Sequence, residues 1–459
     1  MTTDDALASA LARDVPLGAF ADVGWVRFAF VAVRTGPYLL SMPYDPDTGI
    51  ASLAPRFPLY AWDEREMMQE RGIRVEGHPD PRPLRSDAAG TMPRPIVADG
   101  PGVTRIVVGP VHAGIIEPGR FTISSGGETI VHLDAQLGYQ HRGIERVLEG
   151  RSVTETAHGV ARVCGSCSAA RSYAFASAVE SIAGLCCDPA VELARLIVCE
   201  LERLYNHLAD LAACCAGAGW RPGFVRGLAL KEEAMRLCAR VGGHRLLFDT
   251  IAPGGVKRGL LDDRRAVRVE LDALAVRVER YLDRLFSHPS LNDRWHRAGI
   301  IGHDVARALG LVGPAHRASR GAVDLRAFAP YGAYAFMPPR VATASAGDVL
   351  ARCRVKRDEL RDTLRLLQAA LRELGDASLP PPRTASWGDG TAVSAVEGPR
   401  GAEIAAVRLE NGGRIACINL RSASFRNWPG VARAMDGGIV PDFPLVNKSF
   451  NLCYACVDR

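Results

Sequence analysis

Two pairs of cysteines have a spacing that suits metal binding. They lie in Cys164-Gly-Ser-Cys167 and Cys453-Tyr-Ala-Cys456. Two intervening residues let both thiolates reach one metal without straining the backbone. One such pair is equally typical of a redox dithiol or half a zinc site, and zinc-ribbon pairs lie about 15 to 20 residues apart. Here residues 168–452 separate the pairs. A shared metal would therefore join distant parts of the fold, as catalytic centres often do.

The other eight cysteines follow no iron–sulfur spacing, and several fall within helical patterns that favour burial. They are Cys186, Cys187, Cys199, Cys214, Cys215, Cys238, Cys353 and Cys417. If the chain carries out redox chemistry, its electrons must leave through another chain.

Composition describes an ordinary globular protein. The 459 residues are 47% hydrophobic and 23% charged, which allows more than one domain. The formal charge is +5, but the basic residues are scattered, so we predict no nucleic-acid partner. No signal-peptide pattern and no run of about 18 apolar residues occurs, so we expect a cytoplasmic protein.

The elements that must position the cysteines begin with a small α/β unit. Apolar runs at 25–33 and 38–42 predict a hairpin, and residues 62–69 are helix-prone. We place this domain at residues 1–85. Residues 86–103 are rich in proline and glycine and are typical of a linker.

Residues 104–459 form the second predicted domain. Residues 104–133 indicate strands, with Ser124-Ser-Gly-Gly127 as a hairpin turn. Long helices are expected from Pro189 onward, where Asp188 is the N-cap, and at 226–248, 262–286 and 348–374. Strands return at 404–409 and 414–421, and the rest is expected to be mostly loop. The predicted fold class is α+β, with a large, mainly helical domain and peripheral β-structure.

The cysteine motifs resemble those of a known family. Arg162-Val-Cys-Gly-Ser-Cys-Ser168, with Ala178-Val-Glu180 after it, looks like the N-terminal nickel-ligand motif of NiFe hydrogenase large subunits. The final Cys453-Tyr-Ala-Cys-Val-Asp-Arg459 looks like their C-terminal motif.

Further stretches resemble the branch of this family that is related to respiratory complex I. Residues 64–80 of the first domain resemble complex I's small peripheral-arm subunit, which formate-hydrogenlyase-type hydrogenases carry fused to the large one. The matching stretches of the second domain are His141-Arg-Gly-Ile-Glu145, Glu200-Leu-Glu-Arg-Leu-Tyr-Asn-His207, Pro253-Gly-Gly-Val256, Pro399-Arg-Gly401 and Phe425-x-Asn-Trp-Pro429. The resemblance thus covers nearly the whole chain.

The resemblance implies a Ni–Fe bimetallic centre that interconverts dihydrogen with protons and electrons. Cys164 and Cys453 would bind nickel terminally, while Cys167 and Cys456 would bridge nickel and an iron with diatomic ligands. Soft thiolates suit both metals.

Two further residues would act beside that centre. By resemblance, Glu145 would carry the proton onward, and Arg400 would lie above the iron. Without the family motifs around them, Glu145 would be interpreted as an acid on a helix surface and Arg400 as a salt-bridge partner at a strand end. His141 and His207 are expected to be structural rather than ligands.

The same resemblance implies partners. We expect an iron–sulfur small subunit of the complex I type, membrane-arm subunits, and a formate dehydrogenase or ferredoxin-type electron partner. The chain would then lie against the inner face of the cell membrane through those subunits.

Three positions depart from the family pattern. Arg171 and Ala405 each replace a histidine, and Asn451-Leu452 replaces Asp-Pro before the last cysteine pair. Changes around ligands tune metal affinity and orientation.

Two other functions stay open. One is a complex-I-like, NADH-quinone-oxidoreductase-related subunit that couples electron transfer to a membrane arm without hydrogenase activity. Quinone reduction is disfavoured because Gly165 stands where the quinone-binding relative has a tyrosine. The other is a structural zinc site with four cysteine ligands.

Overall fold

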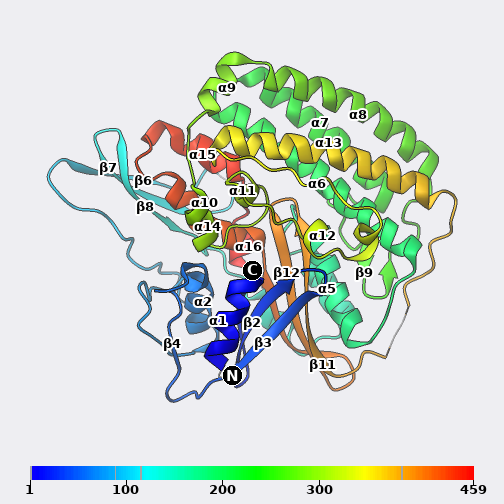
Figure 1. The fold of residues 1–459 in the computed structure, drawn as a ribbon, viewed down its shortest axis with the longest axis horizontal. Helices are drawn as coiled ribbons and strands as arrows, with labels where there is room; N and C mark the ends of the chain where they lie inside the picture. Colours follow the sequence, from blue (N-terminus) through cyan, green and yellow to red (C-terminus); the bar gives the residue numbers. More distant parts are fainter. Residues whose placement is uncertain (1–2, 88, 114–115, 384–385) are drawn as a thin grey trace.

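A three-stranded antiparallel sheet lies near the start of the chain. In the computed structural model, which describes residues 3–87, 89–113, 116–383 and 386–459, its order is β1-β2-β3 (Figure 1). The predicted hairpin is β2 and β3. The elements of this N-terminal unit are α1 (Thr3–Arg13), β1 (Val15–Asp22), β2 (Trp25–Ala32), β3 (Gly36–Pro43), β4 (Ile50–Ala51), the 3₁₀ turn η1 (Pro58–Tyr60), α2 (Ala61–Arg71) and β5 (Val75–Glu76).

Both faces of this N-terminal sheet are buried. Because side chains alternate along a strand, Phe28 and Phe30 of β2 pack on one side, in a core that also holds Met67 of α2. Ala29 and Val31 face the other way and share a core with strands of the second domain. The N-terminal unit is therefore packed directly against the rest of the molecule. The division of the chain at residue 85 stays a prediction.

Two more antiparallel sheets belong to the large domain. Their orders are β6-β7-β8 and β11-β12-β13. The second lies against the N-terminal sheet, and Val393 and Ile404 contribute to the shared core (Figure 1). Their strands are β6 (Val103–Val108), β7 (Arg120–Gly126), β8 (Thr129–Gln136), β11 (Gly390–Gly398), β12 (Gly401–Glu410) and β13 (Arg414–Arg421).

The β7–β8 turn is two residues later than predicted. Strand β7 continues through Gly126, and Gly127 takes the turn with φ +63°, a left-handed conformation that glycine adopts without steric cost.

Long helices cover one side of the large domain, and α6 lies at their centre (Figure 1). It packs against α7, α13 and α15. Asp188 caps α6 as predicted, because its side chain accepts the backbone N–H of Ala190. The helices and short strands of this region are α3 (Ile144–Leu148), α4 (Val153–Ala161), α5 (Ser168–Ile182), α6 (Pro189–Gly217), α7 (Arg221–Gly242), β9 (Ile251–Ala252), β10 (Gly255–Val256), α8 (Arg264–Phe286), α9 (Pro289–Trp295), α10 (His303–Ala308), α11 (Gly313–Arg317), α12 (Leu325–Phe328), η2 (Gly332–Ala335) and α13 (Val349–Leu374).

The loop predicted after residue 421 is wrong. The structure has three helices there, α14 (Ala423–Ala434), α15 (Phe443–Phe450) and α16 (Ala455–Asp458), with the turn η3 (Val440–Asp442). Pro429 lies inside α14. Proline disfavours a helix interior by about 3 kcal/mol, but Phe425, Trp428 and Val431 are fully buried along this helix. Tertiary packing outweighs the local preference.

Six of the eight other cysteines are buried, in keeping with the expectation from their helical patterns. They are Cys199, Cys214, Cys215, Cys238, Cys353 and Cys417.

Candidate metal centre

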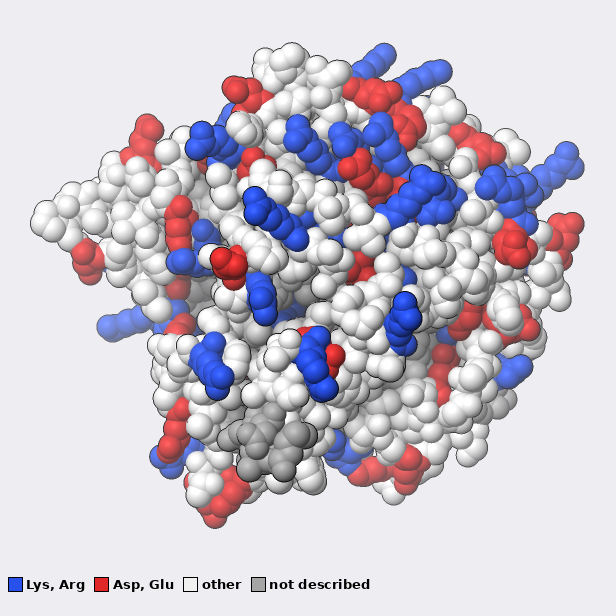
Figure 2. Space-filling view, viewed as in Figure 1, with Lys and Arg blue, Asp and Glu red and all other residues white. Residues whose placement is uncertain are grey.

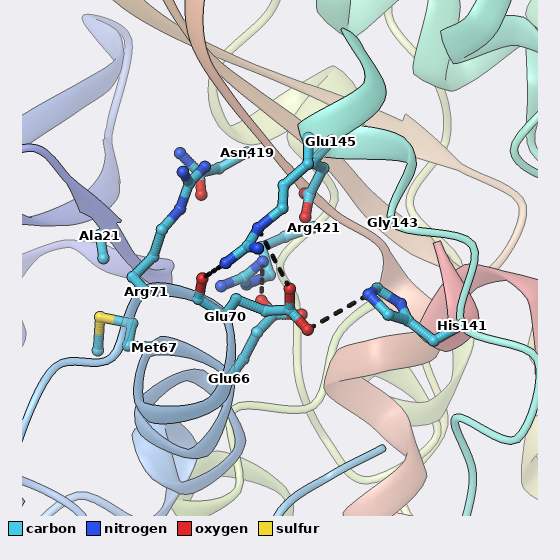
Figure 3. Close-up of a pocket in the computed structure, with 11 residues that line it drawn as sticks. Ala21, Glu66, Met67, Glu70, Arg71, His141, Gly143, Glu145, Asn419 and Arg421 are labelled. Carbon is cyan, nitrogen blue, oxygen red and sulfur yellow. Dashed lines mark hydrogen bonds and ion pairs between the residues drawn. The ribbon is translucent and has the colours of Figure 1, made fainter. Parts of the chain in front are cut away.

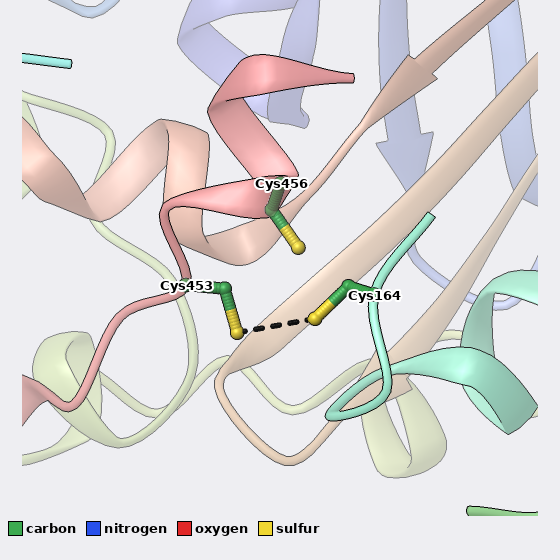
Figure 4. A group of neighbouring side chains, drawn as sticks. All are labelled: Cys164, Cys453 and Cys456. Carbon is green, nitrogen blue, oxygen red and sulfur yellow. Dashed lines mark hydrogen bonds between the residues drawn. The ribbon is translucent and has the colours of Figure 1, made fainter. Parts of the chain in front are cut away.

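The two cysteine pairs meet in one cluster, which we call the cysteine cluster. Cys164 Sγ lies 3.3 Å from Cys453 Sγ, and Cys167 Sγ lies 3.3 Å from Cys456 Sγ. The Sγ atoms of Cys164, Cys453 and Cys456 are all within 4.8 Å of one another (Figure 4). Residues that are 289 positions apart along the chain are thus brought together.

The four thiols differ in access. Cys164 and Cys453 line a cavity of about 400 Å³, together with Arg400 and Asn451. Cys167 and Cys456 are buried and are not among the residues that line it. One member of each pair therefore faces open space, and the other faces the protein interior.

Helix α6 holds the loop of the first pair. Tyr205 Oη donates to Gly165 O (2.8 Å) and Asn206 Nδ2 to Ser166 O (2.9 Å). Glu202 accepts the N–H groups of Ala169 and Ala170 at the start of α5. A carboxylate is favourable at a helix N-terminus, yet burial raises the pKa of Glu202 to about 8.

The second pair is held by α14. The N–H of Cys453 donates to Ser424 Oγ (3.0 Å), and Trp428 Nε1 donates to Cys453 O (3.4 Å). Arg142 joins the two halves, because its Nη2 donates both to Val163 O (2.8 Å) and to Ala455 O (3.0 Å). The position of each cysteine pair thus depends on distant parts of the chain.

Arg400 is a buried cation on the wall of the cavity. Its Nη1 donates to Asn206 Oδ1 (2.9 Å), its Nη2 lies 3.4 Å from Asp210 Oδ1, and its Nε donates to Asn451 O. Burial alone would lower the pKa of Arg400, but Cys453 and Asp210 more than offset that effect and raise it. A charged donor is therefore fixed beside Cys453.

Arg171 is the second buried cation of the cluster. Its Nη2 contacts Cys167 Sγ and Cys456 Sγ, each at 3.2 Å. Hydrogen bonds with the neighbouring thiols, with the charge of Arg171 adding to them, hold the pKa of Cys456 well below its ordinary value. Hydrogen bonding with Cys164 raises the pKa of Cys453. The cluster thus favours at least one thiolate.

Glu145 lies outside this cavity. Its carboxylate accepts the N–H of Leu420 (2.6 Å) and lies 3.7 Å from Arg459 Nε. It lines a separate cavity of about 20 Å³, which also contains Glu66 and Glu70 (Figure 3). We call Glu66, Glu70 and Glu145 the carboxylate cluster. The segment from Cys456 to Arg459 connects the two clusters.

Residues 30–95 match the family described as the 30-kDa subunit of respiratory-chain NADH dehydrogenase, and residues 218–385 match its 49-kDa subunit. The chain is 30% identical to formate hydrogenlyase subunit 5 of Escherichia coli over 435 residues, which cover 89% of this chain and 76% of that protein. The chain belongs to the family of complex-I-related hydrogenase large subunits. The family resemblance predicted from the sequence is confirmed, as is the α+β fold class.

A second member of this oxidoreductase family aligns as well. The carbon monoxide-induced hydrogenase of Rhodospirillum rubrum is 30% identical over 360 residues, which cover 77% of this chain and 99% of that protein. The structure of a membrane-bound sulfane sulfur reductase, an archaeal respiratory membrane complex, shares the fold. Its TM-score is 0.72 at 24% identity, and the match covers 78% of this chain and 99% of that chain.

No membrane-spanning helix is found within the described ranges, since none of their helices is both long and apolar enough to cross a bilayer.

Charged residues of both signs are interspersed on the face shown in Figure 2, in keeping with the scattered basic residues of the sequence.

Two departures from the family pattern have clear structural settings. Asn451 ends α15 with φ +50°, a left-handed conformation that asparagine tolerates, as the family's aspartate would. Ala405 lies within β12, fully buried and paired with Ser394 and Leu420. It offers no side-chain donor.

The two histidines expected to be structural have protein partners. His141 Nδ1 bonds to Asp458 O (2.7 Å), and His207 Nε2 bonds to Glu359 Oε2 (2.7 Å). Neither belongs to the cysteine cluster.

Five residues that hold the cysteine cluster or its two arginines in position were not identified from the sequence. They are Arg142, Glu202, Asn206, Asp210 and Glu403. All five lie inside or within three residues of motifs noted in the sequence. Three of them, Glu202, Asn206 and Asp210, are spaced four residues apart on α6 and therefore lie on one helix face. This spacing was the sequence signal that could have identified them.

Proposed function

We propose that this chain is the catalytic large subunit of a membrane-associated, complex-I-related NiFe hydrogenase of the formate-hydrogenlyase type, which interconverts dihydrogen with protons and electrons. The observation that carries the proposal is the cysteine cluster, in which one thiol of each pair lines a cavity and the other does not. Cys164 and Cys453, the proposed terminal nickel ligands, are the two on the cavity. Cys167 and Cys456, the proposed bridging ligands, are the two inside.

The donor set fits such a centre. Thiolates suit nickel and low-spin iron, and the buried Nη1 of Arg171 has no hydrogen-bond partner in the described residues. An unpaired buried donor costs about 1–3 kcal/mol, which an acceptor belonging to a bound group would relieve. When bound, the Ni–Fe centre supplies the heterolytic cleavage of dihydrogen.

The spacing of the four thiols does not separate zinc from nickel, because nickel held by the same four cysteines would also gather all four sulfurs around one metal. With Zn–S bonds of about 2.3 Å, all four sulfurs would be about 3.8 Å apart. Only three of the four Sγ atoms form a group whose members all lie within 4.8 Å of one another, and Cys167 is outside it. A structural zinc site is closed, whereas Cys164 and Cys453 face a cavity of about 400 Å³, which favours a catalytic centre.

The protein's own residues have proposed roles around this centre. Arg400 would orient substrate at the cavity wall as a fixed cation, held by Asn206 and Asp210. Glu145 would hold the proton as it leaves, since it lies beyond the end of the segment that carries Cys456. We propose that an iron–sulfur small subunit takes the electrons and that membrane-arm subunits dock the complex.

Metal analysis tests the proposal. The whole complex is expressed anaerobically with nickel supplied, and nickel, iron and zinc are measured per chain, with the Cys456→Ala complex giving the partner's iron as background. We expect one nickel and one additional iron, and reduction of a dye by dihydrogen. Zinc alone would support the structural zinc site. Absence of all three metals would overturn the hydrogenase and support the coupling subunit.

A further inference from the structure

Arg171 is placed to act on the two buried thiols together. It lies in the first turn of α5, four residues after Cys167, and its side chain is fully buried. Residues four apart on a helix are neighbours on one face, which directs the guanidinium back to the cysteine cluster. The resemblance has a histidine here, so the arginine is a feature of this chain.

The contacts of Arg171 select two of the four sulfurs. Nη2 is 3.2 Å from Cys167 Sγ and 3.2 Å from Cys456 Sγ. These are the two thiols that do not line the cavity. No hydrogen bond joins Arg171 to Cys164 or Cys453 in the described part of the chain.

Glu403 fixes the orientation of Arg171. Its Oε2 accepts from Nη2 (2.7 Å) and from Nε (3.2 Å), and its Oε1 accepts the N–H of Ala423 at 3.3 Å. Both side chains of this ion pair are about 98% buried. A carboxylate held by β12 and α14 thus determines where the cation points.

A fixed cation affects sulfur differently from a histidine. Arginine keeps its charge and carries five N–H donors, whereas a neutral imidazole donates one. Charge-assisted hydrogen bonds to thiolates withdraw electron density from sulfur, and hydrogen bonds at ligand sulfurs are among the factors that set the reduction potentials of metal centres. In a buried site this effect is only weakly screened.

We propose that Arg171, oriented by Glu403, is a positioning residue that holds the two bridging thiolates in place and raises the reduction potential of the metal centre. The proposal rests on the proposed function. It also accounts for the missing histidine at position 171, since the arginine supplies a stronger donor from the same helical turn.

The test compares four variants of the anaerobically purified complex. Arg171→Met removes donor and charge, Arg171→His restores the family residue, and Glu403→Gln removes the countercharge. Arg195→Met is the matched control, because Arg195 is equally buried. It forms an ion pair with Glu180 (2.5 Å) that does not involve the cysteine cluster. Each complex is assayed for nickel and iron, for the rate of metal release to a chelator, and for the midpoint potential of the centre.

We expect opposite shifts from the two members of the pair. Arg171→Met should lower the midpoint potential and speed metal release roughly 10- to 100-fold, and Arg171→His should lie between it and the wild type. At pH 8, Glu403→Gln should raise the potential, because the cation then acts without its countercharge. Arg195→Met should shift neither quantity, and a purely structural role would not give opposite signs.

Two failures are distinguishable. A wild-type complex without nickel overturns the proposed function, and this inference with it. A nickel-loaded wild type whose potential and metal release are unchanged in Arg171→Met overturns the role of Arg171 alone. If Arg171→Met does not assemble, the signs of the shifts in Arg171→His and Glu403→Gln decide, and equal potentials in both would overturn the proposal.

Discussion

The C-terminal segment carries two buried clusters of opposite chemistry. Cys453 and Cys456 at its start join the cysteine cluster, where Arg171 contacts two thiols and Arg400 lines a cavity of about 400 Å³. Arg459 at its end joins the carboxylate cluster, where Glu66 pairs with three arginines around a cavity of about 20 Å³. The first has room for a ligand and donors for a metal. The second has room for about one water and balances charge with charge.

Similar cations therefore serve different purposes in the two clusters. In the cysteine cluster Arg171 divides its donors between Glu403 and two thiols, so part of its charge polarises sulfur. In the carboxylate cluster the arginines neutralise acids and anchor the end of the segment.

The largest effect is expected from removing a buried thiol. Cys456→Ala should abolish nickel binding and reduce dihydrogen-dependent dye reduction by more than about 100-fold, beyond the loss typical of groups around the ligands. Cys238→Ala, at a fully buried cysteine of α7 outside the cluster, should keep both. Full nickel occupancy in Cys456→Ala would show that the cysteine cluster is not the metal site.

Removing the proposed proton carrier should leave the metal in place. Glu145→Gln is expected to lower turnover about 10²- to 10⁴-fold, the usual contribution of a positioned acid or base, with unchanged nickel content. Glu149→Gln is the matched control, because Glu149 lies just after the same helix and pairs with Arg71 instead. Wild-type turnover in Glu145→Gln would leave the carboxylate cluster with an anchoring role only.

A smaller loss is expected at the cavity wall. Arg400→Lys keeps the charge but cannot reproduce the three contacts to Asn206, Asp210 and Asn451. Turnover should fall about 100-fold, as for the loss of one fixed donor to a reacting group, while nickel is retained. Arg408 lies on β12, eight residues after Arg400, is about 19% exposed and pairs with Asp22. Arg408→Lys should behave as the wild type. Unchanged turnover in Arg400→Lys would contradict a role for its geometry.

Sequence spacing was enough to identify the two cysteine pairs and the long helices, because both are local patterns in the sequence. It could not show that Cys164 and Cys453 face a cavity while their partners are buried, since that follows from packing between segments 289 residues apart. From the sequence, Arg171 was interpreted only as the loss of the family's histidine. Its contact with Glu403 on β12 shows how the arginine takes the place of that histidine. Helix α14 was missed because Pro429 suggested a loop, whereas its burial depends on the whole domain.

The smallest effect should come from titrating the carboxylate cluster, and it tests whether this cluster anchors the segment. Burial raises the pKa of Glu70, but hydrogen bonding from His141 and the charge of Arg85 outweigh it and lower the pKa to about 2. A carboxylate whose pKa is lower in the folded state stabilises that state above its unfolded pKa of about 4.5. This contribution is lost as the pH falls from about 4.5 to about 2.

Hydrogen exchange of the peptide spanning Cys453–Arg459, corrected for the intrinsic rate at each pH, measures the effect directly. In the wild type, protection should fall about 10- to 100-fold over that range, which corresponds to about 1–3 kcal/mol of local stability. Glu70→Gln should already exchange faster at pH 5 and change less on acidification, because it has no charge to lose. The exposed Glu155→Gln should match the wild type. If the peptide is as well protected in Glu70→Gln as in the wild type at pH 5, the carboxylate cluster does not anchor the segment. Proton transfer by Glu145 would then be the only role proposed for this cluster.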